Sequence, residues 1–293
     1  MSDRLNMIPL PDAKGPRLRP FSGQIESIQF LRLLSSELHV ASGDGVPHSR
    51  VFHVRIKGQS YALKVVSRTE ILPPPHSASR IISYKFNFFS LEELRPWVPL
   101  GEHLLKNKDK TIQHQLDPFF AECRAFGRLV EKGRDDELAV RCYGYVLLPE
   151  TIERQIQEQF GIADWNRGRE DEGQPLRAII KYYIRYKTPF NRKPFAVMRK
   201  NIENLNGLGI YNMDIRKENY LGGRLFDFSI AITSPHLNLW SKLRFEHQIQ
   251  EDMKYDLECL DEIADEAKQQ QIKDRVISKE YNLRRISGRT RGK

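Results

Sequence analysis

The sequence predicts an α+β fold, with a β-rich N-terminal part and a helical C-terminal part. Two β-rich runs, 51–56 and 60–66, are joined by a short glycine-containing link, which is typical of a β-hairpin. Apolar residues recur on one face over 119–130, as in an amphipathic helix. A charged and mostly helical stretch at 243–273 follows towards the C-terminus.

The N-terminal elements are expected in the following order. Residues 1–22 mix charges and prolines and are predicted to form a flexible leader, and 27–38 a short amphipathic helix. A glycine-bearing turn at 41–45 precedes the hairpin. Residues 68–116 include three consecutive prolines, which break regular elements, so we expect an insertion with some local structure.

The middle of the chain predicts one helix and two strands. Asp117 is expected to cap the helix, with Pro118 in its first turn and Gly133 at its end. Apolar and β-branched residues predict strands at 139–148 and 176–186. The segment between them is polar and acidic, and we expect a loop at 164–174.

The C-terminal part begins with a predicted helix at 193–208. Residues 210–229 predict a loop and two strands joined by a tight turn at Gly222-Gly223. The end of the chain, 284–293, is a basic tail. A solvated disordered end, nuclear import and phosphate contact are all consistent with such a tail.

Composition limits the class of protein. Hydrophobic residues make up 40% of the 293 residues, enough for a sizeable core, and the formal net charge of +9 favours acidic partners without choosing among them. Cys123, Cys142 and Cys259 are too few and too scattered for a disulfide framework or a zinc site. Neither a signal peptide nor an apolar run of about 20 residues is present. We therefore expect a soluble intracellular protein.

Two segments of the hairpin region have the residue types that bind a nucleotide. Phosphate binding requires close approach of the backbone, which Gly43 and Gly45 allow, and Val51 would cover an adenine ring. Ala62 and Lys64 lie on the following strand, and Lys64 would bind the phosphates. Alternatively, the glycines form an ordinary hairpin turn and the lysine is a solvated strand residue.

A helix glutamate is expected to hold this lysine in place. Glu122 lies beside the apolar stripe of the predicted helix, so it would be turned towards the sheet, where it can pair with Lys64. Glu131 is the competing candidate. Most helix glutamates are surface residues, so the pairing depends on the other residues of the constellation being present.

The segment 210–229 has the residue types that phosphoryl transfer requires. Asp214 would accept or orient the hydroxyl proton of the acceptor, and Arg216 could neutralise the transferred group. Asn219 and Asp227 would hold Mg²⁺ through oxygen ligands. The alternative is a hairpin whose Asp and Asn side chains only satisfy turns. Asp227 lies between two phenylalanines and would need a metal or a hydrogen-bond network to offset its burial.

In this order, the residues resemble the protein-kinase-like superfamily over about 40–232. The spacing from Asp214 to Asn219 matches the Asp-x-x-x-x-Asn of the kinase catalytic loop. The segment 117–129 also looks like that of fungal kinase-like proteins that are subunits of the inner-kinetochore complex. The resemblance implies an N-lobe-like sheet with one helix and the insertion at 23–186, and a reduced helical C-lobe at 187–275. Composition places a basic tail at 276–293. The resemblance also implies a nuclear, centromere-associated protein.

The sequence departs from the kinase pattern at several positions. Asn212 and Met213 precede Asp214, where most protein kinases have His and Arg, and Ser229 replaces the glycine of Asp-Phe-Gly. No Ala-Pro-Glu segment follows, and the remaining chain is too short for a full helical lobe. The resemblance therefore implies a two-lobed fold with an abbreviated C-terminal lobe, and supports ATP binding better than phosphorylation of a protein.

Three hypotheses about function follow. The first is an atypical kinase that binds Mg-ATP and transfers its γ-phosphoryl group to a hydroxyl acceptor, with enzymatic activity left open. The second is a catalytically weak or inactive kinase-fold scaffold within a multi-subunit nuclear complex. The third is a basic nucleic-acid-binding protein, which rests on charge alone because no binding motif is present. For localisation, the nucleus is favoured over the cytoplasm.

Overall fold

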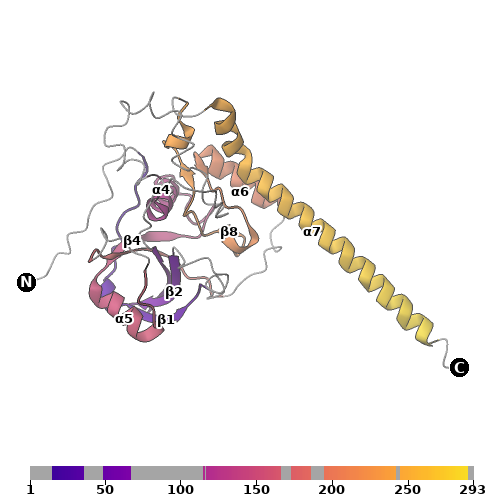
Figure 1. Cartoon of the computed structure of the whole chain (residues 1–293), viewed down its shortest axis with the longest axis horizontal. Helices are drawn as coiled ribbons and strands as arrows, with labels where there is room; N and C mark the ends of the chain where they lie inside the picture. Colours follow the sequence, from indigo (N-terminus) through magenta and orange to yellow (C-terminus); the bar gives the residue numbers. More distant parts are fainter. Residues whose placement is uncertain are drawn as a thin grey trace, which may run out of the picture.

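The structure, a computed structural model, describes residues 15–35, 49–66, 115, 117–165, 173–185, 195–241 and 245–289, and side chains of the last range through 273 except 271. The predicted turn at 41–45 and nearly all of the predicted insertion at 68–116 lie outside these residues. Within them the protein is an α+β fold, as predicted (Figure 1).

A five-stranded antiparallel sheet forms the N-terminal part, in the order β1-β2-β3-β5-β4. Its strands are β1 (Gln29–Leu33), β2 (Ser49–Ile56), β3 (Gln59–Val66), β4 (Cys142–Leu148) and β5 (Leu176–Tyr182). The predicted hairpin is β2 and β3, and its register places Val51 opposite Lys64. β3 also pairs with β5, so the two strands that are central to the site are neighbours.

The predicted helix at 27–38 was wrong. A short 3-10 helix (Ile25–Ser27) leads into β1, in which Gln29 and Phe30 pair with Arg55 and Val54 of β2. The pairing of β1 with β2, a tertiary interaction, therefore outweighs a local helical pattern.

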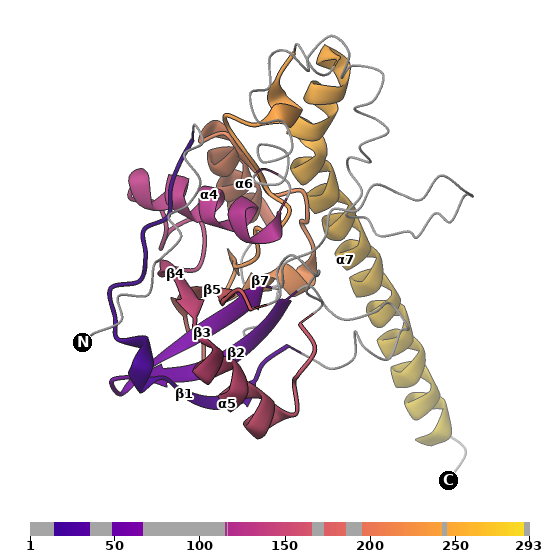
Figure 2. The same cartoon turned by 60° about the vertical axis from the view of Figure 1, so that its left-hand side comes forward.

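Successive strand residues point to opposite faces of the sheet. Leu63 and Val65 of β3 belong to a hydrophobic cluster with helix α5 (Glu150–Phe160), whereas Val66 belongs to another with helix α4 (Pro118–Glu131). The two helices therefore cover opposite faces (Figure 2). Helix α5 was not predicted from the sequence.

Helix α4 begins as predicted. The Asp117 carboxylate accepts hydrogen bonds from the backbone N–H groups of Phe119, at 2.8 Å, and Phe120, at 3.4 Å. Its second oxygen lies 2.9 Å from Nη1 of the buried Arg177 on β5. The cap therefore also attaches α4 to the sheet.

The end of the predicted leader is packed rather than flexible. Leu18 is buried, and Phe21 N–H donates to the carbonyl of Tyr145 on β4 at 2.8 Å. A Cβ at Gly127 of α4 would lie 2.6 Å from the carbonyl carbon of Arg17, so glycine lets α4 and this segment approach.

The C-terminal part contains helix α6 and a set of short elements. They are α6 (Phe195–Gly207), β6 (Ile210–Tyr211), a 3-10 helix (Lys217–Asn219), β7 (Tyr220–Leu221), β8 (Arg224–Leu225), β9 (Ile232–Thr233) and a 3-10 helix (Leu237–Leu239). β7 and β8 form the hairpin predicted around Gly222-Gly223. Helix α7 (Glu246–Arg289) packs on α6 through its N-terminal half and then runs away from the domain (Figures 1 and 2).

Helix α7 continues past the predicted end at residue 273, through most of the predicted basic tail. None of the described helices has the length and apolar character required to cross a membrane.

Candidate functional site

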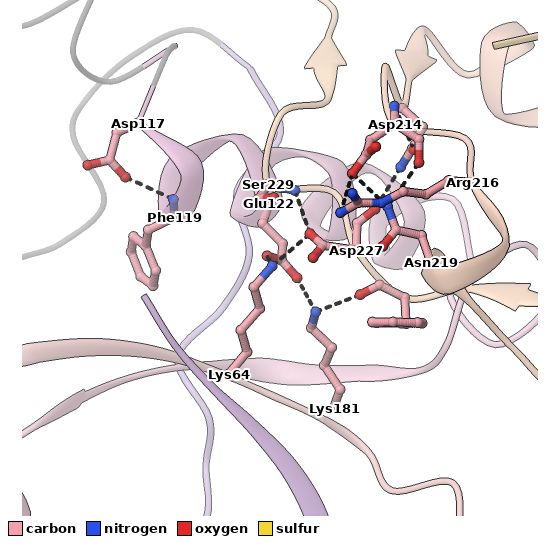
Figure 3. A network of polar contacts seen from close by, with 12 residues as sticks. Lys64, Asp117, Phe119, Glu122, Lys181, Asp214, Arg216, Asn219, Asp227 and Ser229 are labelled. Atoms are coloured by element: carbon pink, nitrogen blue, oxygen red, sulfur yellow. Dashed lines mark hydrogen bonds and ion pairs between the residues drawn. The ribbon is translucent and has the colours of Figure 1, made fainter. Parts of the chain in front are cut away.

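Four charged side chains meet between the sheet and α4 (Figure 3). Lys64 Nζ lies 2.8 Å from Glu122 Oε2 and 2.7 Å from Asp227 Oδ1. Lys181 Nζ, from β5, pairs with Glu122 Oε1 and donates to the Phe226 carbonyl at 2.7 Å. We call Lys64, Lys181, Glu122 and Asp227 the buried cluster.

Strand alternation explains how the two lysines meet. Lys64 shares the α4 face with Val66, and Lys181 shares it with Ile179. The register pairs Ala62 with Lys181, so the two ammonium groups approach the same point below α4. The expected pairing of Glu122 with Lys64 is present, whereas the competing Glu131 is exposed and lies near Lys132.

Burial makes this pairing electrostatically strong. Burial alone would lower the pKa of Lys64, but the carboxylates of Asp227 and Glu122 outweigh it and raise that pKa. Burial would likewise raise the pKa of Asp227, but Lys64 and Lys181 hold it well below its usual range. Lys64 and Asp227 are therefore an ion pair at neutral pH, within a cluster of two ammonium and two carboxylate groups.

A second group, more open to solvent, adjoins the buried cluster. Asn219 Nδ2 donates to Asp214 Oδ2 at 2.7 Å, and Arg216 Nη2 lies 3.1 Å from the same oxygen. The Asp214 and Arg216 side chains are 22% and 49% exposed, and Asp227 is 19% exposed. Burial raises the pKa of Asp214, while Arg216 and Asn219 act in the opposite direction. Asp227 is thus the boundary between the buried cluster and solvent.

Helix α7 holds the loop that precedes Asp214. The buried Asp256 accepts hydrogen bonds from the backbone N–H groups of Asn212, at 2.6 Å, and Met213, at 2.8 Å. Met213 has a positive φ of 63°, which is strained for a non-glycine residue. Asn212 Nδ2 in turn donates to the Asp227 carbonyl at 2.7 Å. Burial raises the pKa of Asp256 to about 6.

The structure brings together most of the residues predicted for the site. Val51 and Ala62 are cross-strand partners of Lys64 and Lys181, so they lie on the same face of the sheet as the lysines. The remaining predicted residues form the groups described above: Lys64, Glu122, Asp214, Arg216, Asn219 and Asp227. Gly43 and Gly45 lie outside the described residues.

No group of three or more His, Cys, Asp or Glu side chains suited to a metal ion occurs within the described residues. Asn219 and Asp227 remain the two predicted oxygen donors for Mg²⁺. One Asp227 oxygen already accepts from Lys64 and, at 2.9 Å, from the Ser229 N–H. Phosphate and water oxygens would have to complete the octahedral coordination of an Mg²⁺ held by Asn219 and Asp227, as is usual for this ion.

Sequence reasoning missed two residues of the site. Lys181 lies in an apolar strand in phase with Ile179, and that alternation was a usable signal. Asp256 lies on a charged helix, and no local pattern separates it from its acidic neighbours.

A comparison with protein families identifies the chain. The model of the family described as kinetochore Sim4 complex subunit FTA2 matches residues 6–232, which include the buried cluster and the group around Asp214 but not Asp256. A search of curated proteins found no match. Because the family match covers most of the sequence, the chain belongs to the kinetochore Sim4 complex subunit FTA2 family.

Proposed function

We propose that the chain is a kinase-like scaffold subunit of a nuclear kinetochore complex, stabilised by its own buried charges rather than by a nucleotide. Membership of a kinetochore subunit family supports protein partners and a nuclear location. The scaffold role is the function that the charge arrangement favours.

The order of the elements supports a kinase-like fold. In protein kinases, a lysine on the third strand pairs with a glutamate on the following helix, and the catalytic loop lies further along the chain. Here Lys64 lies on β3 and pairs with Glu122 on α4, and 214–219 follows α6. The proposed division is an N-lobe-like part at 23–186 and a reduced C-terminal part at 187–275.

The observation that carries the scaffold proposal is the position of Lys181. A kinase-like lysine–glutamate pair leaves the metal-binding aspartate to be neutralised by a cation that accompanies the nucleotide. Here the second ammonium group takes one oxygen of Glu122, which leaves Lys64 shared between Glu122 and Asp227. Two ammonium groups balance two carboxylates, so the described groups need no ligand to offset burial.

A second candidate function is the binding of Mg-ATP. In its favour, Asp214, Asn219 and Asp227 lie together on the more open side of Lys64. Asn219 and Asp227 would hold Mg²⁺, and Lys64 would bind phosphate oxygens. Bound ATP would supply a γ-phosphoryl group, for which Asp214 would orient a hydroxyl and Arg216 would neutralise charge. Val51 and Ala62, with Gly43 and Gly45, would line the nucleotide.

Isothermal titration of the full chain with Mg-ATP separates the two candidates. The scaffold proposal expects no binding tighter than a Kd of about 1 mM. The second candidate expects binding that is lost in Asp227→Ala and Lys64→Ala but kept in Asp214→Asn, because Asp214 is assigned to the acceptor rather than to the nucleotide. Binding that is unchanged in Asp227→Ala would contradict both candidates, because the nucleotide would then bind away from this site.

A further inference from the structure

The outer face of α7 changes character where the helix leaves the domain. Residues 254, 258, 261, 265 and 268 are exposed and charged, and their spacing of 4 and 3 places them on one face of a helix. The same face continues at Ile272, which is 61% exposed. Positions 276, 283 and 286, which hold Val, Leu and Ile, fall on this face as well. Along this face of the helix, exposed charged positions are thus followed by mostly aliphatic ones.

Helix α7 packs on its own domain through the opposite side. The buried residues of α7 include Ile249, Asp256, Leu260 and Ile263, and these positions lie on the opposite side of the helix. Among the described side chains of α7, none is buried after Ile263. From there the helix runs on to Arg289, about 39 Å at 1.5 Å per residue, away from the domain (Figure 1).

The spacing of the apolar residues is that of a coiled-coil seam. Positions 272, 276, 279, 283 and 286 alternate by four and three residues, and four of the five are aliphatic. Lys279 is the exception, and a single polar residue in a seam fixes the register of the partner. We call 272–286 the seam.

Charge indicates what covers the seam. Residues 272–289 contain six Lys or Arg and two Asp or Glu. The positions that flank a seam in the heptad pattern include Lys273, Arg275 and Arg289, against one acid, Glu280. Flanking charges select partners of opposite sign, so the complementary helix is apolar at its own seam and acidic beside it.

Helix α7 of a second copy does not supply that combination. Pairing seam with seam would bring two basic segments together, which is unfavourable. The acidic half of α7 has the correct charge, but its exposed face holds Lys254, Glu258, Asp261, Asp265 and Lys268 instead of apolar residues. Duplex DNA would use the basic charge but would leave the apolar stripe in water.

We propose that residues 272–286 of α7 dock an acidic, amphipathic helix of another subunit of the kinetochore complex. The proposal rests on the scaffold function above, and it gives that function a binding surface. The charge balance of the buried cluster does not involve the seam, so either claim can fail alone.

The test uses the full chain assembled with the other subunits of its complex. Val276→Asp with Leu283→Asp adds two negative charges to the seam. Ser278→Asp with Tyr281→Asp adds the same charge on the opposite face of the helix. We expect the affinity for the complex to fall at least about tenfold for the seam variant and to change less than about threefold for the control. An unchanged unfolding midpoint of the domain would show that both variants fold.

Photo-crosslinking identifies the occupant. A photoreactive residue at 276 or 283 is expected to crosslink to an acidic helix of another subunit, and one at 278 or 281 is not. Equal loss of affinity in both double variants, crosslinks between two copies of this chain, or a strongly salt-dependent affinity for duplex DNA that both variants lower equally would each overturn the proposal.

Discussion

Replacing Lys181 with methionine removes one charge from the buried cluster with little change in volume. The Lys181 side chain is 5% exposed and that of Glu122 is fully buried. Without the second ammonium group, Lys64 must compensate both Glu122 and Asp227, so one negative charge stays unbalanced. Leaving a buried charge without its partner costs about 3–5 kcal/mol. At about 2 °C per kcal/mol for a chain of this size, the unfolding midpoint should fall by about 6–10 °C.

Urea unfolding followed by circular dichroism measures this cost, and a double-mutant cycle assigns it. Lys181→Met in a Glu122→Gln background leaves the balanced pair of Lys64 and Asp227, so the substitution should be at least about 2 kcal/mol less costly there. Lys268→Met, which breaks an exposed pair with Asp265, is the control and should change the unfolding free energy by less than about 1 kcal/mol. A Lys181→Met variant as stable as the wild type, or equally costly in both backgrounds, would refute the charge-balance reasoning.

Three further predictions concern stability. Because burial raises the pKa of Asp256 to about 6, above about 4 in an unfolded chain, the folded state binds more protons between these values. Asp256 should therefore lower the unfolding free energy by about 2 kcal/mol as pH rises from about 4 to 6, and urea unfolding of Asp256→Asn should show a smaller fall than the wild type; identical slopes would be inconsistent with this. Asp117→Ala removes a helix cap and leaves the buried Arg177 without this carboxylate, so it should lower the unfolding free energy by about 3–5 kcal/mol. The control Asp136→Ala breaks a surface pair with Arg224 and should lower it by less than about 1 kcal/mol. Equal losses in the two variants would argue against a structural role for the cap. Gly127→Ala forces a Cβ against the backbone of Arg17 and Leu18 and should lower the unfolding free energy by about 1–3 kcal/mol. The control Gly207→Ala places its Cβ in open space on α6 and should not lower it. A Gly127→Ala variant more stable than the wild type would contradict the close packing.

Local chemistry predicted a large part of the fold. The β2–β3 hairpin and the start of α4 follow from turn and capping residues that act over a few positions. The helix predicted at 27–38 was wrong because the strand there forms only by pairing with β2, which is distant in the sequence. Helix α5 was overlooked although Ile152 and Ile156, the buried residues of that helix, have helical spacing within a polar segment.

The candidate site was likewise predictable only in part. The contact between Asp214 and Asn219 follows from their spacing in the sequence, and the pairing of Lys64 with Glu122 was expected from the order of the segments. The alternation of Lys181 with Ile179 could have placed Lys181 on the buried face, but its approach to Lys64 depends on the register of β3 against β5. Asp256 acts through a tertiary contact between α7 and the loop at Asn212 and Met213, and therefore could not be inferred from its neighbours in sequence.

The most direct test of the scaffold account is the unfolding midpoint of the full chain in excess Mg-ATP compared with EDTA. A ligand at 100 times its Kd adds about 2.7 kcal/mol, which would raise the midpoint by about 5 °C. The account predicts a midpoint that is unchanged within about 1 °C, because the buried cluster is balanced without a ligand. A rise of several degrees that disappears in Asp227→Ala would contradict it and establish a nucleotide site instead.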